Sequence, residues 1–109
     1  MRFLQTHQML ATVAHGVAEL DRLVRVRDLP EPATVNVRVD STGPRITVQW
    51  VDPEVVKRAS RLLGIPDPHV EQQGQPSYDV VKSEGMIDVE DGRCAVTLFA
   101  VPNLDRLLR

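Results

Sequence analysis

The chain has 109 residues, of which 42% are hydrophobic, and a formal net charge of −2 at pH 7. This length and apolar fraction suit one core, so we expect residues 1–109 to form a single domain. The near balance of charge argues against strong non-specific attraction to nucleic acid or to an anionic membrane.

The sequence also bears on the compartment and the origin of the protein. Cys94 is the single cysteine, so no disulfide can form within the chain. The first ten residues are too polar for a signal peptide, and no apolar run approaches the length of a membrane span. We therefore expect a cytoplasmic protein. Eleven arginines against two lysines and seventeen valines favour a high-GC bacterium or one of its mobile elements as the source.

Residues 2–26 contain no proline and carry a seven-residue apolar repeat, which predicts a long amphipathic helix. The repeat consists of Phe3, Leu10, Val17 and Val24, with Val13 and Leu20 between them. Such a seam suits either a coiled-coil partner or packing on a sheet. Gly16 in the middle costs about 1 kcal/mol of helix propensity relative to alanine.

The next segment predicts a hairpin followed by a helix. Residues 34–39 and 46–51 alternate apolar and polar side chains around the turn-forming segment 40–45, which is typical of two antiparallel strands. Asp52 then supplies a cap, and Gly64 can end a helix over 53–63. We expect the apolar face of this helix, made of Val55, Ala59, Leu62 and Leu63 with Val56 at its margin, to cover the hairpin.

The stretch from 65 to 76 contains three prolines and has no apolar period, so we interpret it as an irregular connector. A connector of this length can act as a functional loop. His69 lies within it, and Asp79 follows it.

The last third of the chain predicts three further strands, over 78–82, 86–90 and 93–101, with Asp91 and Gly92 as a hairpin turn. The 93–101 strand is apolar on both faces, and Phe99 lies on the face opposite Cys94. Such a strand belongs at the centre of a sheet or against a partner subunit. Asn103 can cap a final helical turn over 103–109.

These elements predict an α+β fold in the order α-β-β-α-β-β-β. We expect an antiparallel sheet of four to five strands, the 93–101 strand at its centre, and two helices packed on one face.

Catalytic and metal-binding patterns are weak. His7 and His15 are eight residues apart, which places them two turns apart on a helix with no third ligand nearby. Asp88 and Glu90 are better explained as a solvated strand face, and Cys94 as a buried, inert thiol. We therefore predict no catalytic residues, no metal site and no cofactor, and we do not expect an enzyme.

Basic residues on the second helix offer an alternative function. Lys57, Arg58 and Arg61 could contact phosphates, and Arg38 and Arg45 could extend the patch. No aromatic residues interleave with them, so the stacking platform of single-strand binders is missing.

The sequence favours a small, non-enzymatic protein-interaction or regulatory module that associates with itself or with another chain. The expected interface consists of Leu10, Val17, Leu20 and Phe99. The alternative is a nucleic-acid-associated accessory protein that uses Lys57, Arg58 and Arg61. A third hypothesis is a small-molecule enzyme in which the 65–76 loop closes over a pocket and His69 or Asp79 is the acid-base group.

Overall fold

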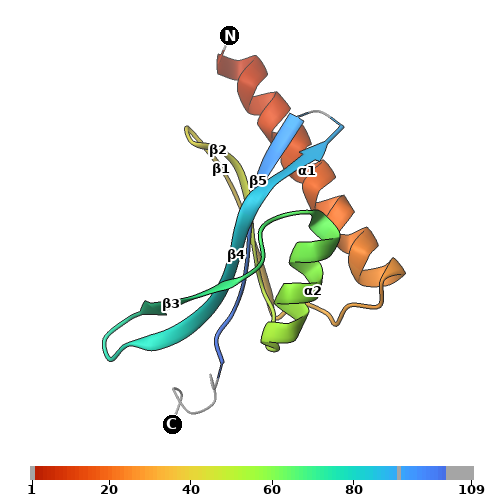
Figure 1. Cartoon of the computed structure of the whole chain (residues 1–109). Helices are drawn as coiled ribbons and strands as arrows, with labels where there is room; N and C mark the ends of the chain where they lie inside the picture. The colour runs from red at the N-terminus through yellow and green to blue at the C-terminus, as the bar shows by residue number, and fades with distance from the viewer. Residues whose placement is uncertain (1, 91, 103–109) are drawn as a thin grey trace.

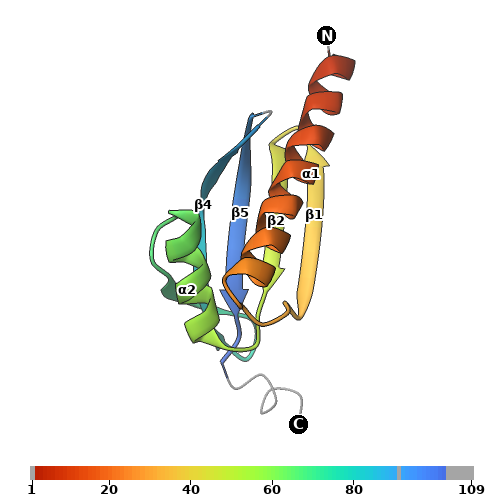
Figure 2. The same ribbon diagram turned by 90° about the vertical axis from the view of Figure 1, so that its right-hand side faces the viewer.

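The computed structural model describes residues 2–90 and 92–102, with side chains described from residue 8 onward. Its elements are α1 (Arg2–Val26), β1 (Thr34–Asp40), β2 (Gly43–Gln49), α2 (Pro53–Leu63), β3 (His69–Gln73), β4 (Tyr78–Val89) and β5 (Gly92–Ala100). The strands form one five-stranded sheet in the order β1-β2-β5-β4-β3, and both helices lie on the same face of it (Figure 1, Figure 2). The predicted α+β class, element order and single helical layer are confirmed. The cap at Asn103 and the turn residue Asp91 lie outside the described residues.

The sheet is mixed rather than wholly antiparallel. Strand β5 lies between β2 and β4, as expected for a strand that is apolar on both faces. It pairs antiparallel with β4 but parallel with β2, where Ile46 lies opposite Val96. The chain reaches this parallel arrangement through α2 and the β3–β4 hairpin, a long connection of the kind that parallel strands require.

The core lies between this sheet and the two helices. Alternate residues of the three central strands are buried on the helical face, among them Ile46, Val48, Val96 and Leu98. Trp50, just after β2, is 2% exposed, and its indole Nε1 donates a hydrogen bond of 2.8 Å to the carbonyl of Pro30. This bond fixes the linker between α1 and β1 to the core.

Helix α1 packs on the sheet through one part of its seven-residue repeat, Val13 and Leu20, together with Gly16 and Leu23, while Leu10 and Val17 of the same repeat are exposed. Val13, Gly16, Leu20 and Leu23 are buried. A Cβ added at Gly16 would lie 2.7 Å from Ile46 Cδ1, so glycine permits the close approach of helix and strand. Leu20, expected at an interface, is therefore a core residue at 8% exposure. The side chain of Phe3 lies outside the described ones.

Helix α2 has the predicted ends. The Asp52 carboxylate accepts the Glu54 backbone N–H at 2.9 Å, and Gly64 adopts a left-handed conformation with φ of 72°. Its buried face differs slightly from the prediction, because Val56 is fully buried whereas Leu62 is exposed. Helix α2 packs on β4 and β5, and its buried face is shifted around the helix axis from the predicted face toward Val56.

The 65–76 segment is not a structureless connector. It contains β3, which pairs antiparallel with the first part of β4. Strand β4 also continues through Ser83 and Gly85, where the sequence predicted an interruption. Ile65 and Pro66 pass closely over β4 at Ser83 and Gly85, and only small side chains at these two positions leave room for them. The Ser83 hydroxyl donates to the carbonyl of Pro66 at 2.5 Å, and a Cβ on Gly85 would lie 2.7 Å from Ile65.

Among the described residues, neither helix combines the length and the apolar character needed to cross a bilayer.

Candidate functional site

Four exposed apolar side chains lie on α1 and on the edge strand β1. Leu10 is 53% exposed, Val17 36%, Val35 51% and Val37 47%. Leu10 and Val17 are seven residues apart and so lie on one side of α1, while Val35 and Val37 project from the helical face of β1. We call these four residues the α1–β1 surface.

The surface is exposed because two helices cannot cover five strands. A helix is about 10 Å wide and strands are about 4.8 Å apart, so each helix covers roughly two strands. Helix α2 covers β4 and β5, and α1 contacts β2 most extensively. Strand β1 is therefore left only partly covered at the edge (Figure 2).

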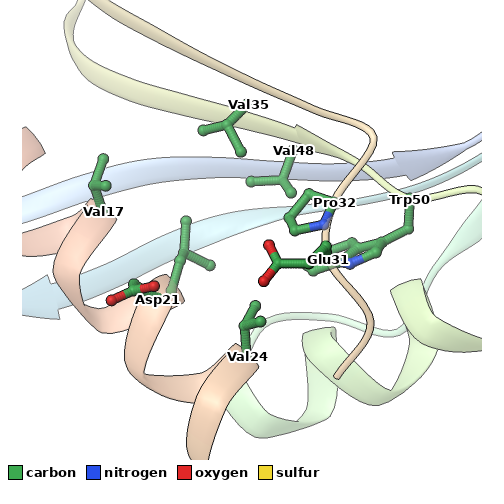
Figure 3. Close-up of a pocket in the computed structure, with 9 residues that line it drawn as sticks. Val17, Asp21, Val24, Glu31, Pro32, Val35, Val48 and Trp50 are labelled. Atoms are coloured by element: carbon green, nitrogen blue, oxygen red, sulfur yellow. The ribbon is translucent and has the colours of Figure 1, made fainter. Parts of the chain in front are cut away.

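A cavity of about 230 Å³ lies between α1 and β1 at this uncovered edge. Figure 3 shows Val17 and Val24 on α1, Val35 and Val48 on the strands, and Trp50 beside them. The lining is mostly aliphatic and aromatic, which suits an apolar side chain of a partner better than a polar substrate.

Two carboxylates stand at the rim of this cavity. Asp21 comes from α1 and Glu31 from the linker before β1 (Figure 3). Asp21 also forms an ion pair of 2.7 Å with Arg25, one turn along the helix. This rim is exposed and polar around an apolar floor, an arrangement typical of protein interfaces.

The four residues predicted for an interface do not form one surface. Leu10 and Val17 belong to the α1–β1 surface, whereas Leu20 forms a buried wall of the cavity. Phe99 is half-buried on the opposite, helix-free face of the sheet. Val35 and Val37 were missed, because strand alternation predicts which face a side chain occupies but not whether a helix covers it.

The helix-free face carries a second open cavity, of about 390 Å³. It is lined by Thr34, Asn36, Arg38, Arg45, Thr47 and Phe99. Arg38 and Arg45 are directly opposite each other on adjacent strands, and Arg38 Nε lies 3.8 Å from Asp40. The pKa of Asp40 is lowered, first by hydrogen bonds from the hydroxyl and backbone N–H of Thr42 and further by the two guanidinium charges.

The basic residues of α2 lie apart from these two arginines. Lys57, Arg58 and Arg61 are exposed on the helical side of the molecule, so the expected extension through Arg38 and Arg45 is wrong. Two of the three cations already have partners on the protein. Arg58 donates to the carbonyl of Arg27 at 3.3 Å, and Arg61 lies 3.5 Å from Asp67.

The residues suggested for acid-base chemistry lie on an exposed edge hairpin. His69 Nε2 is 2.7 Å from Glu71 Oε1, and Glu71 also lies 3.5 Å from Lys82. The pKa of Glu71 is lowered, first by the hydrogen bond with His69 and also by the charge of Lys82. Asp79 pairs with Gln72 and so projects from the other face of the hairpin. The structure does not bring His69 and Asp79 together.

Cys94, His15 and Asp88 have ordinary structural surroundings. Cys94 is fully buried, and burial raises the pKa of its thiol, which opposes formation of a nucleophilic thiolate. His15 Nδ1 lies 3.7 Å from Glu90, and Asp88 pairs with Arg93 at 3.1 Å. The side chain of His7 is outside those described. In residues 2–90 and 92–102, no three His, Cys, Asp or Glu side chains are grouped as a metal site.

Comparison with protein-family models, with curated proteins and with solved structures gave no significant match for this chain. The function must therefore be inferred from the α1–β1 surface and from the cavity of the helix-free face.

Proposed function

We propose that this protein is a self-associating interaction module that buries its α1–β1 surface against a second copy of the chain. The observation that carries the proposal is that Val17 on α1 and Val35 on the edge strand β1 are both exposed and line one cavity, while Leu10 and Val37 are exposed on the same side of α1 and the same face of β1. Contiguous apolar patches at an unpaired edge mark interaction sites, because water contact with them is unfavourable and an edge strand can still form hydrogen bonds.

The edge strand β1 has few of the features that usually protect a sheet edge, since its two charged residues, Arg38 and Asp40, both project from the helix-free face. It contains no proline and no lysine, and it pairs with β2 over seven consecutive residues without a bulge. Proteins commonly use such features to prevent association through an edge. Their absence from β1, together with the exposed valines, favours a partner at this edge.

The test compares one valine on each edge of the same sheet. We expect the wild-type protein to be a dimer by sedimentation, and Val37→Glu to weaken dimerisation at least about tenfold, because a carboxylate would be buried in an apolar contact. Val70→Glu is the matched control. Val70 is 64% exposed on the opposite edge strand β3, so this variant should dimerise like the wild type.

Two results would contradict the proposal. One is a wild-type protein that stays monomeric at its highest soluble concentration. The other is equal weakening by Val37→Glu and Val70→Glu, which would show a general effect of added charge rather than loss of a contact at β1.

A second candidate function is binding of single-stranded nucleic acid on the helix-free face. It is favoured by the cavity that contains Arg38, Arg45 and Phe99, since arginines can bind phosphates and an aromatic ring can stack on a base. Like charges directly opposite each other on neighbouring strands are unfavourable, and a bound phosphate would relieve this repulsion. The support for Lys57, Arg58 and Arg61 is weaker, because the cavity beside Lys57 and Arg61 has no aromatic residue in its lining, whereas Phe99 lies in the same cavity as Arg38 and Arg45.

A pair of double variants separates the two basic surfaces. If the helix-free face binds nucleic acid, Arg38→Ala with Arg45→Ala should abolish retention on a single-stranded oligonucleotide at low salt. Arg58→Ala with Arg61→Ala should leave it unchanged. Two phosphate contacts predict a salt slope of about −1.4 in log affinity against log salt. No retention of the wild type, or loss of retention only in the α2 variant, would exclude this function for the helix-free face.

A further inference from the structure

We infer that two copies of the chain pair through antiparallel β1 strands, with the two-fold axis at Val37, so that their two five-stranded sheets form one continuous sheet. This inference rests on the proposed self-association and specifies its geometry. Strand β1 is at the edge and pairs only with β2 among the described strands, so one side of its backbone is available to another strand.

The faces of the sheet limit the possible registers. Directly opposite residues of antiparallel strands project to the same face, so Val35, Val37 and Val39 of one copy must lie opposite odd-numbered residues of the other. In a symmetric pair, the axis must then pass through a residue of β1 and not between two residues. Asn36, Val37 and Arg38 are the three central choices.

Charge and strand length select Val37 among these three. An axis at Arg38 would place two guanidinium groups directly opposite each other, which is unfavourable. An axis at Asn36 would leave Val39 and Asp40, at the end of the strand, without partner residues in β1. An axis at Val37 pairs all seven residues, Thr34–Asp40, and places Arg38 opposite the neutral Asn36.

The same register covers the apolar surface. Val37 lies opposite Val37 of the partner subunit, and Val35 lies opposite Val39 of the partner subunit. On the helical side, Val17 of α1 lines a cavity together with Val35, so this part of the α1–β1 surface lies beside the contact, and Leu10 is on the same side of α1. The valines that are half exposed in the single chain thus gain apolar neighbours.

The other sheet edge is a poorer partner for β1. Strand β3 has five residues, and Glu71 and His69 on it form an ion-paired cluster with Lys82. Pairing of β1 with β3 of another copy would also be head-to-tail and would build open chains of molecules. Pairing of β1 with itself closes as a dimer.

Disulfide cross-linking tests this register. In Val37→Cys, the two new thiols would lie on directly opposite residues, where Cα atoms are about 4.5–5.5 Å apart, within the range that a disulfide spans. In Val35→Cys, the corresponding Cα atoms would be about 13 Å apart, four residues along the strands, which is too far. We expect Val37→Cys to form a covalent dimer on mild oxidation at least about tenfold faster than Val35→Cys. Wild-type protein, with its buried Cys94, should form none.

Sedimentation of each variant under reducing conditions distinguishes failure of the register from failure of the proposed function. If the wild type and Val37→Cys are dimers but Asn36→Cys cross-links faster than Val37→Cys, the Val37 axis is wrong while self-association holds. Equal cross-linking rates for Val35→Cys and Val37→Cys in dimeric protein would also overturn the Val37 axis.

A monomeric wild type would overturn both the proposed self-association and the proposed register. If Val37→Cys is monomeric while the wild type is a dimer, the rates of cross-linking of Arg38→Cys and Asn36→Cys, measured on dimeric protein, test the position of the axis instead. Slow reaction of both supports the Val37 axis, and rapid reaction of either refutes it.

Discussion

Replacement of Trp50 by alanine is expected to lower the free energy of unfolding by about 3–5 kcal/mol, the usual cost of removing a large buried aromatic side chain. Trp50 is 2% exposed and forms the floor of the cavity beneath α1. Its loss would also leave the Pro30 carbonyl without its indole donor. A domain of this size has about 5–15 kcal/mol of stability in total, so the variant should lose a large part of its free energy of unfolding.

Urea denaturation at one fixed protein concentration measures this effect, because the stability of a dimer depends on concentration. Trp50→Phe separates packing from hydrogen bonding. It retains a buried ring and loses the Nε1–H donor, so it should cost distinctly less than alanine. Met86→Ala, at a 46% exposed position on the helix-free face, should change the stability by less than about 0.5 kcal/mol. Equal costs for Trp50→Ala and Met86→Ala would show that Trp50 is not a core residue.

Gly85→Ala is expected to destabilise the protein by about 1–3 kcal/mol, the usual cost of overpacking a core. The sign of this effect is informative. Alanine is normally favoured over glycine inside a strand by about 0.5–1 kcal/mol, so local propensity alone predicts stabilisation. At this position, however, the new methyl group would lie 2.7 Å from Ile65 Cβ and Cγ2, and 3.2 Å from Pro66 Cδ.

A double-mutant cycle with Ile65→Ala tests whether this contact is the cause. The second substitution removes Cγ2, one of the two Ile65 atoms at 2.7 Å, and keeps Cβ, so it relieves part of the overlap with the methyl group on residue 85. The double variant should therefore be more stable than the sum of the two single effects predicts, by at least about 0.5 kcal/mol. Strictly additive effects, or a stabilising Gly85→Ala, would contradict the crossing of residues 65 and 66 over β4.

Much of the fold could be predicted because the relevant signals are local. Asp52 and Gly64 act within one helical turn of the residues they cap, and the β1–β2 hairpin joins strands that are adjacent in sequence. Alternation along residues 93–101 likewise predicted that Cys94 faces the core and Phe99 does not.

The missed features depend on contacts between distant residues. Gly85 and Ser83 were interpreted as an interruption because both disfavour a strand locally, yet they are the residues that allow Pro66 and Ile65 to cross it. The β3 strand was missed because Gln-rich, proline-flanked segments have weak strand propensity, and pairing with β4 outweighs that preference.

The candidate surface was predicted only in part. The seven-residue repeat correctly placed Leu10 and Val17 on one side of α1, but it also included Leu20, which faces the core. Which stripe of a helix packs on a sheet depends on the closest approach of the two backbones, and here Gly16 determines that approach by allowing contact with Ile46. The sequence could not show that Val35 and Val37 lack a covering helix.

The sequence by itself therefore determined the α+β class, the two helices, the ends of α2, the β1–β2 hairpin and the alternation of faces along β1, β2 and β5, because these follow from periodicity and short-range hydrogen bonding. Only the tertiary structure decided the parallel β2–β5 pair, the separation of Arg38 and Arg45 from the basic residues of α2, and the exposure of β1. These features depend on how many strands two helices can cover and on the order in which distant strands meet.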